Sequence, residues 1–300
     1  IRVEDDGEGM TPADAVLALE RHATSKLERL EQLSAVATLG FRGEALPSIA
    51  SVSQLTIRSR AGGSSHGTEV RVDGGVTRST KEVGMPEGTV VEVVDLFFNV
   101  PARRKFLKSD GAESAQISRI LTQLALAHPK VGFTLTSNTR RLLQYPPVAG
   151  LEERFFQLYG ERTNLVSVEK DAAGIRVRGY VASLADHESP RGPQHIFVNR
   201  RAIKNRTVSH AINEAYSRAT IKPRSPEVHL FLEVPADRVD VNVHPMKAEV
   251  RFLEQSLIHE VLRRALGEAI GSGLPPVFPV QFPASVKSAR MTPTIPGVFG

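Results

Sequence analysis

Cysteine and tryptophan are both missing from this chain of 300 residues. Without cysteine, a disulfide scaffold and a thiolate-ligated metal site are excluded, and the lack of cysteine fits a reducing cytoplasm. Apolar runs long enough to cross a bilayer are also missing, as is a signal peptide. The sequence therefore predicts that the protein has no membrane partner.

The balance of charge is mildly basic. Lysine and arginine number 38 and aspartate and glutamate number 33, which gives a net charge of +5. A positive balance suits a polyanionic partner such as nucleic acid, but many basic proteins bind no such partner. The charge alone therefore leaves the partner open.

The chain is expected to form an α+β protein with two domains. Helix-like and strand-like patterns alternate, and 41% hydrophobic composition over 300 residues is enough for two cores. Residues 145–150 hold two prolines and a glycine and are the best candidate boundary. We predict a first domain over 1–150, a second over 151–271 and a flexible Pro- and Gly-rich linker over 272–300.

The periodicity of apolar residues predicts the individual elements. A helix is expected to begin after Thr11, an N-cap followed by Pro12, with Asp14 closing a capping box. Strands are expected at 1–5, 55–58, 68–72, 89–93, near 133 and 142, around 165, and at 175–181, 196–199, 228–234 and 249–252. Helices are expected at 12–22, 26–34, 112–127, 207–218 and 256–270.

The chain opens at Ile1, without a methionine and inside the first of these strands. A natural domain rarely begins inside a strand, so we expect that the sequence lacks its native N-terminus. Alternation with period two sets Asp5 on the same side of the strand as Ile1 and Val3. We expect this side to be the buried one.

The pattern Asp5-x-Gly7-x-Gly9 follows this strand. A carboxylate on a buried face needs a partner, and the exocyclic amine of adenine is a suitable donor. The two glycines allow the backbone to approach a flat ring closely. Asp-Gly is also common turn chemistry, so an acidic turn after a strand explains the same residues.

Two further segments suit the phosphates of a nucleotide. Thr24, Ser25 and Lys26 gather two hydroxyls and an ammonium at a helix end, where they could hold phosphates and a metal ion or simply end the helix. In the second segment, glycines precede a helix start whose free backbone donors suit an anion, so the segment could close as a lid. It consists of Gly40, Phe41, Arg42, Gly43, Glu44, Ala45 and Leu46.

Thr89 and Lys247 are the last two candidates for nucleotide contacts. Thr89 begins a hydrophobic strand, and its hydroxyl could share a water with a base held at Asp5, although a β-favouring threonine explains it equally well. Lys247 lies in the loop after His244 and Pro245 and could reach a phosphate as a point charge. Most loop lysines are simply solvated.

The order and spacing of these motifs resemble the nucleotide-binding motifs of the GHKL ATPase superfamily. Within it, several segments look like the MutL-type DNA mismatch repair proteins, and the resemblance covers residues 1–270. These segments are 21–26, 40–46, 97–107, 197–201 and 240–252. The fold that this implies is a Bergerat-type α/β sandwich that binds ATP, followed by a smaller ribosomal-protein-like α/β domain.

The resemblance also implies a role for each motif. Asp5 would contact adenine, with Gly7, Gly9 and Thr89 around the base. Thr24, Ser25 and Lys26 would line the ribose and phosphates, residues 40–46 would form the lid, and Lys247 would touch the terminal phosphate. ATP and Mg²⁺ are the implied cofactors.

The activity implied by the resemblance is an ATPase that works in DNA mismatch repair. ATP binding would join two N-terminal regions, of this protein or of a paralogue, and close a clamp on DNA. A mismatch-recognition protein of the MutS type would be a further partner. The implied location is the cytoplasm, with the nucleoid, in a bacterium, and the nucleus in a eukaryote.

One departure from the family pattern concerns catalysis. The family's general base is a glutamate on a helix upstream of the Asp-x-Gly-x-Gly strand, near an asparagine that holds Mg²⁺. Both are expected upstream of Ile1, so no catalytic or metal-holding residue is assigned in this chain. We expect the chain alone to hydrolyse ATP negligibly. The nine histidines show no ligand spacing and receive no metal role.

Basic residues suggest where nucleic acid would bind. Arg200, Arg201, Lys204 and Arg206 form one cluster, and residues 103–108 hold another. Clustered cations bind a phosphate backbone by counterion release and without reading sequence. Each cluster could equally be a solvated face. The family resemblance favours the first cluster, and Arg201 above all.

Two other functions compete with this interpretation. Another GHKL ATPase, such as a topoisomerase subunit or a chaperone, shares the Asp-x-Gly-x-Gly motif, but segments 40–46 and 97–107 argue against it. A non-catalytic module that binds DNA without nucleotide is the second alternative. Nucleotide binding would separate this module from the ATPases.

Overall fold

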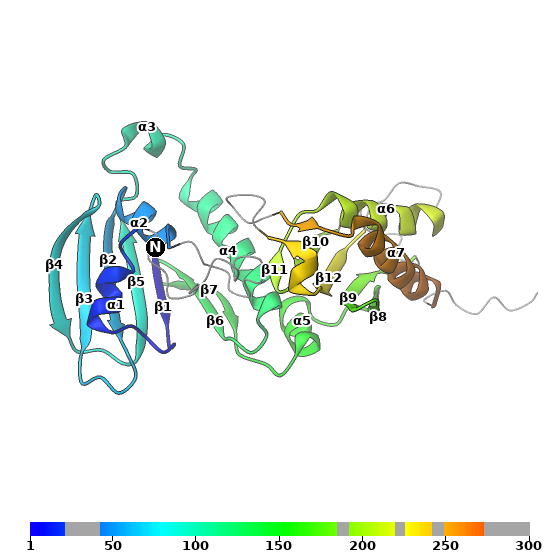
Figure 1. Cartoon of the computed structure of the whole chain (residues 1–300), viewed down its shortest axis with the longest axis horizontal. Helices are drawn as coiled ribbons and strands as arrows, with labels where there is room; N and C mark the ends of the chain where they lie inside the picture. The colour runs from blue at the N-terminus through cyan, green and yellow to red at the C-terminus, as the bar shows by residue number, and fades with distance from the viewer. Residues whose placement is uncertain (22–42, 185–191, 220–225, 242–248, 273–300) are drawn as a thin grey trace, which may run out of the picture.

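A computed structural model describes residues 1–21, 43–184, 192–219, 226–241 and 249–272 (Figure 1). These residues form two five-stranded sheets with helices packed on them, joined by a helix and a hairpin. The α+β class predicted from the sequence is therefore confirmed. Within the described ranges, we find no helix that is both apolar enough and long enough to span a membrane.

The first sheet is antiparallel throughout, in the order β1-β5-β2-β3-β4. Its strands are β1 Arg2–Asp5, β2 Gln54–Arg60, β3 Gly67–Asp73, β4 Val76–Val83 and β5 Gly88–Val94. Two short helices, α1 Pro12–Leu17 and α2 Ala45–Ala50, pack on one face. The core there is built from Leu55 and Ile57 of β2 and from Val70 and Val72 of β3.

Helix α1 begins as its sequence predicts. The Thr11 hydroxyl accepts a hydrogen bond from the Asp14 backbone N–H at 3.2 Å, and Pro12 occupies the first helical position. The Asp14 carboxylate, however, accepts from the Thr11 hydroxyl at 2.6 Å, so the contact joins two side chains. Thr11 therefore caps the helix, and the described helix ends at Leu17, earlier than predicted.

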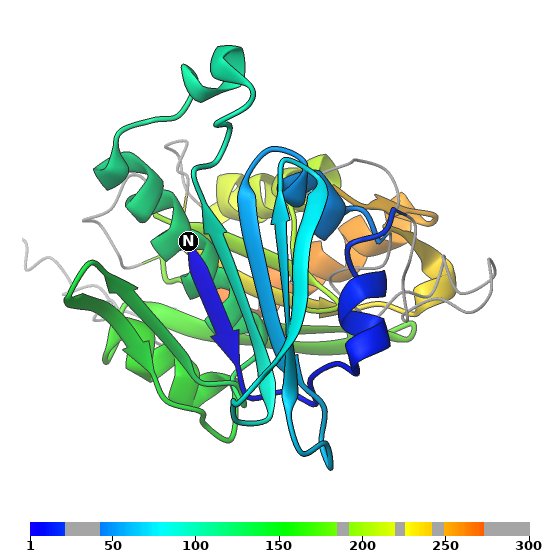
Figure 2. The same cartoon turned by 90° about the vertical axis from the view of Figure 1, so that its left-hand side faces the viewer.

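The burial of β1 corrects the prediction for Asp5. All four residues of the strand are exposed, and Ile1 and Val3 keep 72% and 60% of their surface. Among the described residues, β1 is the edge strand of its sheet, and α1 and α2 pack over β2 and β3 instead (Figure 2). Asp5 is thus an accessible carboxylate and needs no buried partner.

Strand β4 was missed by the sequence analysis. Its residues, Val76–Val83, are polar apart from the two ends, and most are exposed. An edge strand is held by backbone hydrogen bonds to a single neighbour, here β3, so it needs no apolar face. The alternation rule detects half-buried strands and gives no signal for this one.

The outer face of the first sheet carries a buried carboxylate under three cations. Glu69 of β3 is 2% exposed and accepts from Arg58 at 2.6 Å and from Arg71 at 2.8 Å. Lys81 of β4 lies 3.2 Å from the same carboxylate. Burial acts to raise the pKa of Glu69, but the hydrogen bonds from Arg58, Lys81 and Arg71 outweigh it and lower the pKa to about 2.

We expect Glu69→Gln to destabilise the protein by about 2–3 kcal/mol at pH 7. This loss is smaller than that of breaking a fully buried ion pair, because the cations around Glu69 are partly solvated. The folded pKa lies below the ordinary 4.5. The carboxylate therefore stabilises the fold above about pH 4.5, and this contribution is lost as the pH falls towards 2. Urea unfolding at pH 7 and pH 3 measures it.

The matched control is Glu82→Gln on the adjacent strand β4, where the carboxylate is 76% exposed and lies 3.3 Å from His66 Nε2. We expect this change to stay within about 0.5 kcal/mol. Equal losses for the two variants, or a Glu69→Gln loss as large at pH 3 as at pH 7, would contradict the interpretation.

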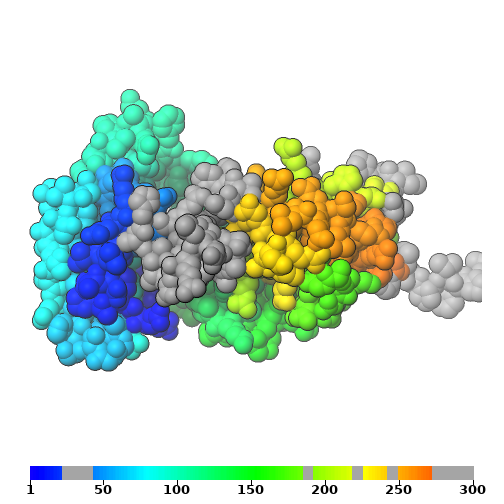
Figure 3. Space-filling model, in the orientation of Figure 1, coloured from blue at the N-terminus to red at the C-terminus, as the bar shows by residue number. Residues whose placement is uncertain are grey.

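A helix and a hairpin connect the two sheets. Helix α4, Asp110–Ala127, corresponds to the helix predicted at 112–127, and β6 Phe133–Ser137 pairs with β7 Arg140–Tyr145. The short helix α3, Pro101–Arg104, and the residues around it project from the body at the top of the view (Figure 3). Helix α5, Leu151–Tyr159, was not predicted.

The second sheet has the order β11-β10-β12-β9-β8. Its strands are β8 Leu165–Ala172, β9 Ile175–Ala182, β10 Gln194–Val198, β11 Arg201–Ala202 and β12 Val228–Glu233. Only β10 and β12 are parallel among these pairs, and α6, Arg206–Ala219, makes the crossover between them. The pair β13 Val239–Asp240 and β14 Arg251–Phe252 lies beside the 3₁₀ turn Ala236–Arg238.

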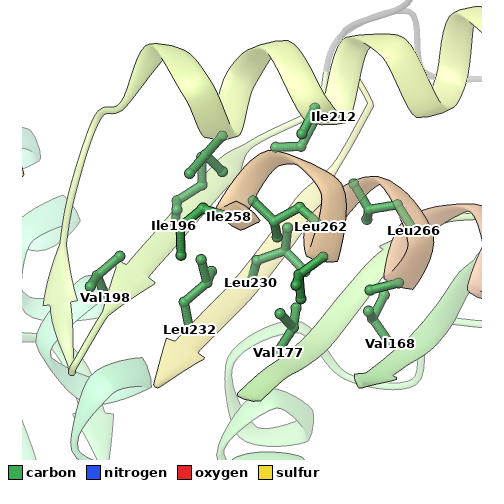
Figure 4. Packing of buried hydrophobic residues seen from close by; sticks show 14 of the residues in the cluster. Val168, Val177, Ile196, Val198, Ile212, Leu230, Leu232, Ile258, Leu262 and Leu266 are labelled. Carbon is green, nitrogen blue, oxygen red and sulfur yellow. The ribbon is translucent and has the colours of Figure 1, made fainter. Parts of the chain in front are cut away.

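Both faces of the second sheet are covered. Helices α6 and α7, Gln255–Ser272, pack on one face over the main core, where Ile212, Ile258 and Leu262 meet the strands (Figure 4). On the other face lie α5 and the end of α4, with Phe155 and Leu126 packed against Phe197. The sheet is therefore the central layer of this half of the molecule.

Candidate functional site

The Asp5–Gly9 motif forms a turn at the end of β1. Asp5 accepts a hydrogen bond through Oδ1 from the Gly7 backbone N–H at 3.0 Å. The turn is tied to the end of β2, because the Met10 backbone N–H donates to Ser59 Oγ at 2.8 Å. The Gly62 backbone N–H also donates to the Glu8 carbonyl at 3.3 Å. The second oxygen of the Asp5 carboxylate thus sits on an exposed, well-anchored turn.

Strand pairing brings Thr89 next to Asp5. The two residues are register partners across β1 and β5, and Thr89 is in turn the partner of Ser59 on β2. Directly opposed residues lie on the same face of a sheet with their Cβ atoms about 5 Å apart. Asp5, Thr89 and Ser59 therefore form a polar row on the face that carries α1 and α2.

The hydroxyls in this row have a defined direction. Ser59 Oγ donates to the Gly88 carbonyl at 3.1 Å and lies 2.9 Å from Thr89 Oγ1. Since a hydroxyl has one hydrogen, that contact makes Thr89 the donor to Ser59. The free lone pairs of Thr89 and the Asp5 carboxylate then offer acceptors side by side, which suits a ligand that presents an amine or a bridging water.

Ser59 was not singled out by the sequence analysis. It is fully buried and continues the apolar face of β2 after Leu55 and Ile57. A serine at a position where alternation calls for an apolar residue is the signal that could have identified it. Its hydroxyl links the Asp5 turn, through Met10, to Thr89.

Two glycines of this region are fixed by close backbone packing. Gly9 has φ +67°, and a Cβ there would lie 1.9 Å from the Arg60 carbonyl oxygen. Gly88 has φ +125°, and its Cβ would lie 2.1 Å from the Asp5 carbonyl oxygen. The backbone of the protein itself thus requires these glycines, whether or not a flat ring approaches them.

The predicted lid is only partly within the described residues. Gly43 has φ +60°, Glu44 stands at the N-cap of α2, and Leu46 packs against the core of the first sheet. Helix α2 leads into the start of β2, whereas Asp5 and Thr89 lie at the end of β2. The end of α2 and the pair Asp5–Thr89 therefore lie near opposite ends of β2, which is roughly 20 Å long. Thr24, Ser25, Lys26, Gly40, Phe41, Arg42 and Lys247 lie outside the described residues.

A pocket of about 230 Å³ lies on the same face, towards the β3–β4 side. Its lining includes Arg21, Pro47, Ser51 and Thr77, and it does not include Asp5 or Thr89. We assign the candidate site to the polar row, since that row combines an anion, a hydroxyl and an accessible edge. The pocket has mainly hydroxyl and apolar groups and one guanidinium.

The four residues predicted to bind nucleic acid do not share one surface. Arg200, Lys204 and Arg206 are exposed, but Arg201 is 4% exposed, and burial lowers the pKa of its guanidinium. Arg201 is on β11, directly after a tight two-residue turn. Arg201, which the family resemblance favoured above the others, therefore does not share the exposed surface of Arg200, Lys204 and Arg206, because the hairpin turns its side chain inward.

Asn199 holds that turn in place. Asn199 and Arg200 both have positive φ, as two-residue hairpin turns require. The Asn199 side chain donates to the Val234 carbonyl at 2.8 Å and accepts from the Val234 backbone N–H at 2.9 Å. The amide thereby fixes the turn that presents Arg200 to solvent.

The second basic cluster is exposed. Arg103 and Arg104 end the projecting helix α3, and Lys105 and Lys108 follow. Beside them, Phe106 keeps 84% of its surface accessible. The cluster lies on the segment that stands clear of both sheets (Figures 1 and 3).

A largely buried polar network lies on the α5 face of the second sheet and was also missed. His229 Nε2 lies 2.9 Å from Glu227 Oε1, and His229 Nδ1 lies 3.0 Å from His195 Nδ1. Burial and then the neighbouring His229 lower the pKa of His195 to about 4. Tyr159 of α5 lies 3.4 Å from His195. His195 is therefore neutral at pH 7, and its contacts with Tyr159 and His229 connect α5 to the sheet.

Comparison with known proteins gives consistent results. The family model described as "DNA mismatch repair protein, C-terminal domain" matches residues 157–271. The DNA mismatch repair protein MutL of Trichlorobacter lovleyi is 43% identical over 270 residues, which are 90% of this chain and 46% of that protein. The MutL of Geobacter sulfurreducens is 45% identical over 90% of this chain and 45% of that protein. The chain spans about half the length of these relatives.

Solved structures are similar over most of the chain. The Aquifex aeolicus MutL ATPase domain complexed with ADP is 30% identical, with a TM-score of 0.57, over 87% of this chain and 84% of that one. The N-terminal domain of a DNA repair protein has a TM-score of 0.71 at 23% identity, over 90% and 85% of the two chains. The second likeness concerns the fold alone.

Proposed function

Because the chain belongs to the MutL family of DNA mismatch repair proteins, we propose that its first sheet binds ATP. The base lies against Asp5 and Thr89, with Gly7 and Gly9 in the turn beside it. The observation that carries the proposal is the pairing of Asp5 with Thr89 at an accessible end of the sheet. An oxygen of the Asp5 carboxylate accepts a hydrogen bond from the exocyclic amine of adenine, and the Thr89 hydroxyl accepts one from a bridging water.

The remaining contacts follow the length of the sheet. We assign the phosphates to the opposite end, where residues 40–46 close as a lid ahead of α2 and Thr24, Ser25 and Lys26 line the ribose and phosphates. Lys247 reaches the terminal phosphate from the second of two domains, 151–271, which follows the first, 1–150, and precedes a linker, 272–300. Mg²⁺ accompanies the triphosphate, and no described residue is assigned to hold it.

The activity that we propose for the whole protein is ATP hydrolysis in mismatch repair. Nucleotide binding joins two N-terminal regions and closes them on DNA, and a mismatch-recognition protein of the MutS type directs the process. The similar Aquifex aeolicus MutL ATPase domain is complexed with ADP, which supports nucleotide binding in this fold. Clamp closure, dimerisation and the partners rest on family membership.

Titration calorimetry of a non-hydrolysable ATP analogue with Mg²⁺ into the full-length protein tests the proposal. We expect saturable binding with one nucleotide per chain. A folded protein that takes up DNA but no nucleotide would favour the alternative, a module that binds DNA without ATP.

The exposed basic residues are proposed to bind the DNA backbone. We expect weak, strongly salt-dependent binding, because each phosphate contact releases a counterion. Replacing Arg200, Lys204 and Arg206 together by alanine should reduce the slope of log K against log salt by up to about 3. Fluorescence anisotropy at several salt concentrations measures the slope. The control variant replaces the exposed Lys130, Arg140 and Arg141 by alanine and so removes the same charge elsewhere on the protein. Its slope should be steeper than that of the first triple variant and close to that of the parent.

A further inference from the structure

Two histidines and a glutamate meet on the outer side of the helix pair α6 and α7. His210 and Glu214 are four residues apart on α6 and so lie on one helix face. His259 belongs to the second turn of α7, 45 residues further along the chain than Glu214. The sequence spacing gave these histidines no metal role, and only the packing of the two helices brings them together.

The ligand atoms are close enough to share one ion. His210 Nδ1 lies 2.9 Å from His259 Nε2, and His259 Nε2 lies 3.2 Å from Glu214 Oε2. The third distance, from His210 Nδ1 to Glu214 Oε2, is 4.0 Å. Zinc bond lengths of about 2.0–2.1 Å set tetrahedral ligands about 3.4 Å apart. The observed distances span this value, so only small side-chain movements are needed.

The helices that carry these ligands are rigidly placed. Beneath them, Ile212 on α6 and Ile258 and Leu262 on α7 are buried in one core with the sheet (Figure 4). The separation of the ligand-bearing turns is therefore set by packing, independently of any ion. Preorganised ligands lose little conformational entropy when they bind.

The cluster is partly exposed to solvent. The His210 side chain is 72% exposed, while those of His259 and Glu214 are 24% and 23% exposed. This leaves a fourth position for water, as in three-ligand zinc sites. Arg263 lies near Glu214, but its guanidinium is paired with Glu260 at 2.7 Å, so part of its charge is already balanced.

We propose that His210, Glu214 and His259 bind a divalent transition-metal ion, with zinc the best match. Two imidazole nitrogens and one carboxylate oxygen suit zinc and its neighbours, whereas Ca²⁺ and Mg²⁺ favour all-oxygen sites. The ion links α6 to α7 on the side away from the sheet. The metal site is separate from the nucleotide site, and the proposal does not depend on whether ATP binds at Asp5.

The test uses untagged full-length protein, freed of metal with a chelator and then titrated with Zn²⁺ by calorimetry. Co²⁺ provides a second readout, because nitrogen and oxygen ligands in low coordination give intense visible bands. We expect one ion per chain and a rise in Tm on adding Zn²⁺, since a ligand that binds only the folded state stabilises it. The ATP site must be empty, so nucleotide is omitted.

Three variants and one control locate the ion. His210→Ala, Glu214→Gln and His259→Ala should each lower Zn²⁺ affinity at least tenfold, since even outer-shell changes cost about 10–100-fold. Because His210 is exposed, metal-free His210→Ala should have the same Tm as the metal-free parent. A loss of Zn²⁺ affinity in this variant therefore cannot be due to unfolding. The control, His66→Ala, removes a similar surface histidine that contacts one carboxylate, Glu82, at 3.3 Å. It should bind Zn²⁺ as the parent does.

Three results of the Zn²⁺ titrations would overturn the proposal. They are an absence of Zn²⁺ binding to the folded parent, an affinity unchanged by His210→Ala, and an equal loss in the His66→Ala control. Visible Co²⁺ bands that persist in His210→Ala and His259→Ala would also place the ion elsewhere.

Discussion

Asp5→Asn is expected to lower the affinity for ATP by about 10- to 100-fold, the cost of losing a hydrogen bond to a charged acceptor. The reason lies in the turn. Asp5 Oδ1 accepts from the Gly7 N–H, so the other oxygen is left for a ligand. In asparagine the carbonyl oxygen keeps the bond to Gly7, and an NH₂ group replaces the second oxygen. A donor then faces the amine donor of adenine.

This arrangement also predicts a change in base preference. Inosine triphosphate carries a carbonyl where ATP carries the amine, so the new NH₂ of Asp5→Asn suits it. The parent should prefer ATP, and the variant should lose or reverse that preference. Calorimetric titration of both nucleotides into both proteins measures the preference, and it is independent of any general loss of affinity.

Asp6→Asn is the matched control for Asp5→Asn. Asp6 is the next residue, is exposed, and changes charge in the same way. It should leave ATP affinity within about twofold, as expected for a surface change that touches no ligand. If Asp5→Asn binds ATP as the parent does, or if both variants lose affinity equally, the base does not lie against Asp5.

Gly9→Ala is expected to destabilise the protein by on the order of 3 kcal/mol, as strained backbone combined with a steric clash does. At φ +67° an alanine is already unfavourable, and its Cβ would lie 1.9 Å from the Arg60 carbonyl oxygen. Relief requires the turn to move away from the end of β2. That movement would also break the bond from Met10 to Ser59.

Gly63→Ala separates the two contributions to this loss. Gly63 has φ +78°, and a Cβ there meets nothing within 4 Å. It should therefore cost only the backbone penalty, about 1 kcal/mol. Urea unfolding of the two variants gives the difference, which we expect to be about 2 kcal/mol. Equal losses of stability in Gly9→Ala and Gly63→Ala would mean that the new Cβ at position 9 does not clash with the Arg60 carbonyl oxygen in solution.

The sequence by itself determined the local structure and the family. The Thr11 cap and Pro12 are written in adjacent residues, and α1 begins there. Alternation identified the half-buried strands, and the order of the motifs identified the MutL-type GHKL fold, which the solved relatives confirm. These signals are readable because each depends on residues close together in the chain.

Strands without an apolar face could not be predicted in this way. β4 is held by its hydrogen bonds to β3, and those bonds exist for any sequence that can be extended. Burial of a given residue was not readable either. Asp5 alternates like a buried residue, but the edge position of β1 leaves it exposed, and the hairpin after Asn199 buries Arg201.

Only the tertiary structure decided which distant residues meet. Pairing of β1 with β5 sets Asp5 beside Thr89, 84 residues away, and pairing of β5 with β2 adds Ser59. Packing of α6 on α7 brings His259 to His210 and Glu214. Local chemistry fixes which elements form, but the side chains that share a site are chosen by sheet register and helix packing, which depend on the whole core.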